Sequence, residues 1–194
     1  MIERCGVNSP GTVVAIGMAS YDTYLQMESL PVDEGKHFAR MLGCYCGGMA
    51  TNVAINLRTL GHHVILVHSL GPDLNGMYIE GRLCSYLSKD QLASSRSSRS
   101  FASLIFVERS TSKRLAILTD GEYPDRLSPS QLSAISQADF IYYDGSWPLD
   151  GRLRRAHGGT RDQEVMVNLE FPHEHLSQWY EWADYGVHSL SYLG

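Results

Sequence analysis

The chain contains no apolar run that approaches the ~18 residues of a membrane-spanning helix. Its N-terminus also lacks the charged, then apolar, then small-residue pattern of a secretory signal. Both absences favour a cytoplasmic protein. Hydrophobic residues still make up 43% of the 194 positions, which is enough to build the core of about one globular domain.

Positive charge is scarce. The chain has 16 Lys and Arg residues against 21 Asp and Glu, a formal net charge of −5. A protein that binds nucleic acid usually carries a basic surface, so we expect no nucleic-acid partner. Arginine is concentrated locally only within the serine-rich segment 94–100, which holds two positive charges and is typical of a solvated loop.

Cysteine is sparse as well, with four in the chain, at positions 5, 44, 46 and 84. Cys44 and Cys46 are spaced to share one side of an extended segment, but no second close pair completes a tetrahedral site. The pair His62-His63 and the segment 173–175, His-Glu-His, are equally incomplete. We therefore expect reduced, partly buried thiols and no metal ligands.

Short apolar segments alternate with segments of helical periodicity along most of the chain, which predicts a parallel α/β sandwich. Gly61 should end the first helix, and Asp73 should cap the second. The apolar residues Val53, Leu57 and Leu60 of the first helix should face the sheet. The expected strands are 12–17, 63–67, 140–143, 165–169 and 185–189; the expected helices are 49–60, 75–86, one entered at 127–130, one around 152–155 and one around 175–182.

Two further pairs of segments have strand character and interrupt this alternation. Residues 21–27 and 36–41 flank a turn at 31–35, and residues 101–107 and 114–118 flank a polar turn. Because neither pair fits a strand–helix–strand unit, together they predict a small β lid beside the main sheet. The lid strands should occupy about residues 21–42 and 101–118.

The segment 46–57 carries the strongest functional signal. Two adjacent glycines, Gly47 and Gly48, lead into a helix with Asn52 on its first turn. Glycines let the backbone approach a ligand closely, and a helix N-terminus offers free N–H groups. The Asn52 amide can both donate to and accept from a hydroxyl. This pattern predicts a site for a small polyhydroxylated molecule.

Asp22 follows the first buried strand, near the strand end at which open α/β sheets bind ligands. A carboxylate can accept from two neighbouring hydroxyls and hold a sugar in one pose. The alternative interpretation of Asp22 is an exposed charge on a strand.

The segments 17–22 (Gly-Met-Ala-Ser-Tyr-Asp) and 47–52 (Gly-Gly-Met-Ala-Thr-Asn), in this order and spacing, resemble those of the ribokinase-like (PfkB) carbohydrate kinases. Within that family the chain is most similar to the ketohexokinases. The resemblance implies a ribokinase-like three-layer α/β sandwich with a small β-strand lid. Residues 1–194 would form a single partial domain of this kind.

The resemblance also implies residue roles. Asp22 and Asn52 would bind sugar hydroxyls, and the backbone of Gly47 and Gly48 would lie against the same sugar. Arg114 would reach from the lid towards the phosphates, although a solvated hairpin charge is the alternative. ATP and Mg²⁺ are the implied cofactors, and a small-molecule sugar is the implied partner.

Kinases of this family carry a late Gly-Ala-Gly-Asp type motif, which supplies a base and backbone amides for phosphoryl transfer. No such motif occurs in the 194 residues. The expectation is therefore a carbohydrate kinase whose C-terminal portion is missing, with residues 1–194 inactive as they stand. The alternatives are a noncatalytic sugar-binding or dimerising remnant, with a homodimer through the lid strands, or a nucleoside kinase of the same fold.

Overall fold

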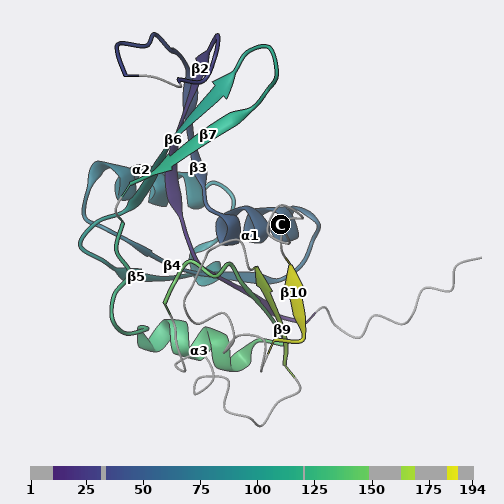
Figure 1. The fold of residues 1–194 in the computed structure, drawn as a ribbon. Helices are drawn as coiled ribbons and strands as arrows, with labels where there is room; N and C mark the ends of the chain where they lie inside the picture. The colour runs from purple at the N-terminus through teal and green to yellow at the C-terminus, as the bar shows by residue number, and fades with distance from the viewer. Residues whose placement is uncertain (1–10, 32–33, 120, 149–162, 169–182, 188–194) are drawn as a thin grey trace, which may run out of the picture.

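The computed structural model describes residues 11–31, 34–119, 121–148, 163–168 and 183–187. Its main sheet has six strands in the order β10-β9-β8-β1-β4-β5, and every neighbouring pair is parallel (Figure 1). The strands are β1 (Val13–Ile16), β4 (Val64–Leu70), β5 (Leu92–Arg96), β8 (Phe140–Tyr143), β9 (Glu164–Asn168) and β10 (Tyr185–Val187).

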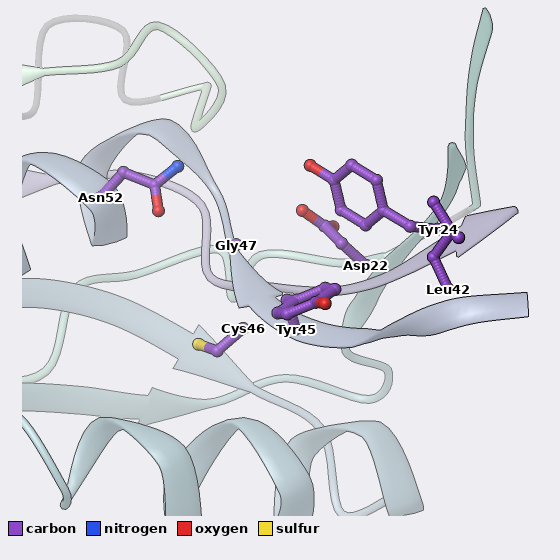
Figure 2. Close-up of a pocket in the computed structure, with 7 residues that line it drawn as sticks. All are labelled: Asp22, Tyr24, Leu42, Tyr45, Cys46, Gly47 and Asn52. Carbon is purple, nitrogen blue, oxygen red and sulfur yellow. The ribbon is translucent and has the colours of Figure 1, made fainter. Parts of the chain in front are cut away.

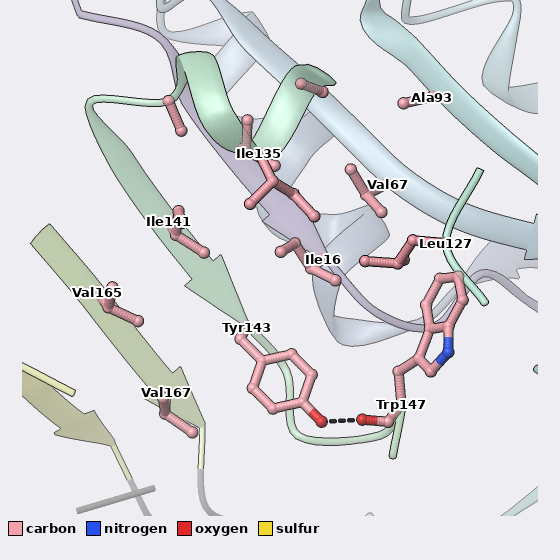
Figure 3. Packing of buried hydrophobic residues seen from close by; sticks show 13 residues of the cluster. Ile16, Val67, Ala93, Leu127, Ile135, Ile141, Tyr143, Trp147, Val165 and Val167 are labelled. Carbon is pink, nitrogen blue, oxygen red and sulfur yellow. Dashed lines mark hydrogen bonds between the residues drawn. The ribbon is translucent and has the colours of Figure 1, made fainter. Parts of the chain in front are cut away.

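Helices cover both faces of this sheet. Alternate strand residues point to opposite faces, so Ala15 and Leu66 pack beneath α1 (Met49–Thr59) and α2 (Leu74–Leu83). Ile16 and Val67 point to the other face, where they pack with Ile135 of α3 (Pro129–Gln137) (Figure 3). The predicted three-layer α/β sandwich is confirmed. A short 3₁₀ helix, η1 (Lys89–Gln91), precedes β5.

A second sheet projects from the carboxyl end of the main sheet (Figure 1). Its order is β3 (Arg40–Gly47), β2 (Ser20–Met27), β6 (Phe101–Glu108) and β7 (Arg114–Leu118). The two outer pairs are antiparallel, while β2 and β6 pair in parallel. The predicted lid therefore exists, and the parallel pair joins its two halves into one sheet.

The expected bounds were wrong for one strand of the lid and for one segment of the main sheet. The strand expected at 36–41 runs instead over β3, because pairing with β2 fixes its register from Arg40 to Gly47, where α1 begins. The serine-rich segment expected to be a loop contributes Ser94–Arg96 to β5, which pairs with β4 at the edge of the main sheet. In β3 the pairing sets the bounds, and in β5 it outweighs the polar composition.

The prediction of which residues of the first helix face the sheet was also partly wrong. Leu60 is 74% exposed, whereas the fully buried positions on α1 are the small residues Ala50, Thr51 and Ala54. Small side chains let the helix approach the sheet closely, and Val53 and Leu57 pack only partly.

The predicted helix starts and the end of α1 agree with the structure, whereas α2 ends at Leu83, three residues before the expected Tyr86. Asp73 Oδ1 accepts a hydrogen bond from the Gly76 amide at 2.7 Å, which confirms the predicted cap of α2. Gly61 has the positive φ of 90° expected after α1, and Ser128 with Pro129 begins α3. The helices expected around 152–155 and 175–182, the 173–175 segment and Cys5 lie outside the described residues. No helix within the described part of the chain is long and apolar enough to cross a membrane.

Candidate functional site

A pocket of about 410 Å³ lies where the lid meets the start of α1 (Figure 2). Three predicted site residues, Asp22, Gly47 and Asn52, line it together. The remaining lining residues come from the two adjacent lid strands: Tyr24 of β2, and Leu42, Tyr45 and Cys46 of β3. One end of the pocket is therefore polar and the other is aromatic and apolar.

Asp22 is held in place by two hydroxyl groups. Its Oδ1 accepts from Ser20 Oγ at 2.8 Å and from Ser103 Oγ at 2.6 Å, across the β2–β6 pairing. Its Oδ2 lies so close to Gly47 that a Cβ on that glycine would be 1.9 Å away. Gly47 thus leaves room for the carboxylate, and Oδ2, which has no hydrogen-bond partner among the described residues, can accept from a ligand.

Gly48 makes the sharp turn from β3 into α1, with φ 101°. A Cβ at this position would meet the Met18 carbonyl oxygen at 2.1 Å, so the backbone passes where no side chain fits. The same carbonyl accepts from Thr51 Oγ1 at 3.0 Å. Gly48 is not among the residues that line the pocket; it positions the helix that carries Asn52.

Asn52 lies on the first turn of α1 and is exposed to solvent. Its backbone amide donates to the Gly48 carbonyl at 2.9 Å, while its side-chain amide has no partner in the described part of the chain. That amide can therefore donate and accept at once, as binding a hydroxyl requires.

Asp144, at the carboxyl end of β8, is a fully buried carboxylate whose structural role the sequence did not reveal. Its Oδ2 accepts from the Met18 amide at 2.8 Å and the Ala50 amide at 3.3 Å; its Oδ1 accepts from the Ser146 amide at 2.9 Å. Burial raises the pKa of Asp144, while these hydrogen bonds act in the opposite direction. The carboxylate links the turn into the lid to the start of α1.

The hydrogen-bond chain extends beyond Asp144. Ser146 Oγ donates to Asp144 Oδ1 at 2.5 Å and is also bonded to the Tyr123 hydroxyl. The Tyr123 ring stacks on Trp147, with centroids 4.5 Å apart, and burial raises the Tyr123 pKa well above its usual range. Tyr123 lies on the segment that returns from β7 to α3, so this connection is tied to the same carboxylate. A sequence signal did exist: an aspartate after the buried strand β8, followed by glycine.

Arg114 lies away from the pocket. It pairs with Val107 at one end of the β6–β7 ladder, whereas Asp22 is level with Ser103 and Leu118 at the other end. Arg114 and Leu118 are four positions apart, a distance of about 14 Å along β7. Arg114 is not among the lining residues, and its contact with phosphates stays a prediction.

Among the described cysteines, Cys46 lacks the lowered pKa of a reactive thiol. Burial, with a smaller effect from the nearby Asp22 charge, raises the pKa of Cys46 to about 12, so its thiol is neutral. No group of three or more metal-ligating side chains gathers within the described ranges.

No model of a known protein family matches the chain, and no curated protein matches its sequence. Solved structures do match. The ribokinase of Giardia lamblia aligns with a TM-score of 0.77 and 15% identity, covering 93% of this chain and 57% of that one. The ribokinase of Thermotoga maritima gives a TM-score of 0.74 and 17% identity, with 94% and 60% covered.

The ribokinase of Arabidopsis thaliana, solved with ribose and ATP, gives a TM-score of 0.65 and 20% identity, covering 84% of this chain and 54% of that one. The chain thus spans between 54% and 60% of the length of these three structures. At these identities the likeness concerns the fold. Together with the parallel sheet and the lid, it shows that the chain has the ribokinase-like fold.

Proposed function

We propose that the pocket binds the acceptor sugar of an ATP-dependent carbohydrate kinase. The observation that carries this proposal is the convergence of Asp22 and Asn52, from separate elements, on one pocket at the base of the lid. The Asp22 carboxylate is already oriented by Ser20 and Ser103, so little side-chain freedom is lost when a ligand binds. The solved structures of the same fold include a ribokinase with ribose and ATP, which supports a sugar ligand.

In this proposal, Asp22 accepts hydrogen bonds from sugar hydroxyls, and Asn52 donates to one hydroxyl and accepts from another. These contacts fix the orientation of the acceptor, which is the positioning part of phosphoryl transfer. ATP would supply the phosphoryl group and Mg²⁺ would neutralise its charge. The described residues offer neither a metal-ligating cluster nor an assigned base, so we assign them the positioning role alone.

Calorimetry of the purified chain against ketoses, aldoses and nucleosides tests the site. Asp22→Ala and Asn52→Ala should each weaken binding of the best ligand by about 1–3 kcal/mol, because buried hydroxyls lose their partners. Asp125→Ala and Asn56→Ala are matched controls, since both residues are exposed and lie outside the pocket. Equal affinity in the wild type and in both site variants would refute the assignment.

A noncatalytic sugar-binding protein is the second candidate. It is supported by the pocket itself, since the described residues that line it can bind a sugar without a catalytic base. A coupled assay with ATP, Mg²⁺ and the best-binding sugar separates the two candidates. We expect binding without appreciable turnover for residues 1–194, because a positioned acceptor still needs a base and charge stabilisation. Turnover on the order of 1 s⁻¹ or more would show that these residues do contain a base.

We also propose that the lid pairs with a second copy of the chain. Strand β7 is the edge of the lid sheet, and all five of its residues are exposed. Leu115 and Ile117 of β7, with Leu104 of β6, form an outer lid patch on the face opposite Ser103 and Asp22. An unpaired strand edge beside exposed apolar side chains favours association.

A further inference from the structure

A second pocket lies at the tip of the lid, the end that projects away from the main sheet (Figure 1). It shares no described lining residue with the proposed sugar pocket. Gln26 at the tip lies four positions beyond Asp22, or about 13 Å farther along β2. The volume of this lid-tip pocket is about 410 Å³, and the ends of three lid strands line it: Gln26, Met27 and Glu28 at the end of β2, Phe38, Ala39 and Arg40 at the start of β3, and Arg109 after β6.

One wall of the lid-tip pocket consists of hydrogen-bond donors. Arg40 and Gln26 are paired directly across β3 and β2, so their side chains lie on the same face of the lid. Neither side chain has a hydrogen-bond or ion-pair partner among the described residues, and Arg40 is exposed. A guanidinium presents five donors in a planar fork, and the amide of Gln26 adds two more. This wall is suited to an anionic group with two or more oxygens.

Arg109 and Glu28 determine how much negative charge the pocket accepts. Arg109 Nη1 lies 2.9 Å from Glu28 Oε1, so these two charges largely neutralise each other. The Arg109 backbone amide donates to the Met27 carbonyl at 2.9 Å, which fixes Arg109 at the end of β2. A ligand with a single negative charge balances the remaining cation, Arg40, whereas a phosphate dianion would also meet the carboxylate of Glu28. The charges of the lining therefore favour a carboxylate over a phosphate.

The other wall of the lid-tip pocket is apolar. It consists of Phe38 and Ala39 at the start of β3 and of Met27, which is only 5% exposed. Phe38 is 94% exposed, so almost its whole ring is open to solvent beside the pocket. An apolar group that covers this ring removes apolar surface of both partners from water. The apolar wall therefore favours a ligand with a ring or a comparable apolar body.

We propose that the lid tip binds a small carboxylate that carries an apolar ring, such as an aryl acetate. Its carboxylate accepts hydrogen bonds from Arg40 and Gln26, and its ring covers Phe38. Because the lining residues come from three strands, the bound ligand joins the ends of β2, β3 and β6. This site is separate from the proposed sugar pocket and does not depend on it.

Calorimetry of the purified chain compares phenylacetate with three probes that each change one feature. Acetate lacks the ring, phenylacetamide lacks the charge, and inorganic phosphate lacks the ring and carries more charge. Phenylacetate should bind on the order of tenfold more tightly than each of the three, because it alone satisfies both walls. A probe that binds as tightly as phenylacetate would overturn the proposal, and so would the absence of phenylacetate binding.

Variants test whether the ligand lies at the lid tip. Arg40→Gln and Phe38→Ala should each weaken phenylacetate binding on the order of tenfold. Arg126→Gln and Leu60→Ala are matched controls, since both residues are exposed and neither lines the pocket. All four positions are on the surface, so the substitutions should leave the fold unchanged. Wild-type affinity in both lid-tip variants would refute the site.

One further variant separates the two pockets. Asp22→Ala removes a proposed sugar contact and should leave phenylacetate binding unchanged. If Asp22→Ala weakened phenylacetate binding as much as Arg40→Gln does, the ligand would lie in the proposed sugar pocket and the lid-tip site would be wrong. The affinity for sugars is measured separately, so the loss of one assignment leaves the other standing.

Discussion

Gly48 and Gly61 both have positive φ, but their surroundings differ. A Cβ on Gly61 meets nothing within 4 Å, whereas one on Gly48 meets the Met18 carbonyl oxygen at 2.1 Å. We expect Gly61→Ala to lower the free energy of unfolding by about 1 kcal/mol, through backbone strain alone. Gly48→Ala should cost at least about 3 kcal/mol, because it adds a clash with the backbone. Urea denaturation measures both values, and equal losses would contradict the close approach at Gly48.

His68 should make stability depend on pH. It is fully buried on β4, and burial lowers its pKa from 6.5 to about 4. Above pH 6.5 the ring is neutral in both the folded and the unfolded chain. Between pH 6.5 and 4 only the unfolded chain binds the proton, so the free energy of unfolding should fall by roughly 3 kcal/mol.

Denaturation at several pH values tests this expectation. His68→Leu should flatten the decline between pH 6.5 and 4, and His62→Leu, at an exposed position, should leave it unchanged. If the free energy of unfolding of His68→Leu fell with pH as steeply as that of the wild type, other groups would cause the decline.

At the scale of elements, Asp73 joins two parts of the chain. Its Oδ1 caps α2, and its Oδ2 accepts from the buried Ser100 amide at 2.8 Å, on the connection between β5 and β6. Asp73→Ala should therefore cost about 2–3 kcal/mol. Ser128→Ala, which removes the cap of α3 and an exposed contact with the Ser130 hydroxyl, should cost about 1 kcal/mol. Urea denaturation gives the free energy of unfolding of both variants. If Asp73→Ala lost no more than Ser128→Ala, the Ser100 amide would have found another acceptor.

Elements with strong local signals could be predicted from the sequence, and those fixed by distant pairing could not. β1 and β8 are short apolar runs, and α1 is set by Gly48 and Gly61. The register of β3 depends on β2, and β5 forms only because β4 offers an edge, so their bounds were missed. A local sequence pattern carries no information about which strand will pair with that segment.

The same distinction holds within the site. The lining positions of Asp22, Gly47 and Asn52 follow from strand ends and a helix start, which are local features. The role of Asp144 depends on amides more than 90 residues away, at Met18 and Ala50. The displacement of Arg114 from the pocket depends on the hairpin register, which the sequence does not specify.

For the molecule as a whole, the outer lid patch of Leu104, Leu115 and Ile117 predicts a dimer. We expect the wild-type chain to sediment as a dimer, and the double variant Leu115→Lys/Ile117→Lys to sediment as a monomer, because buried unpaired charges are costly. Ser110→Lys, at an exposed position of the hairpin turn, is the control and should remain dimeric. A monomeric wild-type chain, or a dimer that survives the double variant, would contradict pairing through this patch.

The parallel pairing of β2 with β6 has a consequence for synthesis of the chain. More than 70 residues separate the end of β2 at Met27 from the start of β6 at Phe101. At a translation rate of about 5–20 residues per second, β2 leaves the ribosome roughly 4–15 s before its central partner is made. The β2–β3 hairpin meanwhile offers an unpaired edge to other nascent chains. This interval is when the protein is most exposed to intermolecular strand pairing and aggregation.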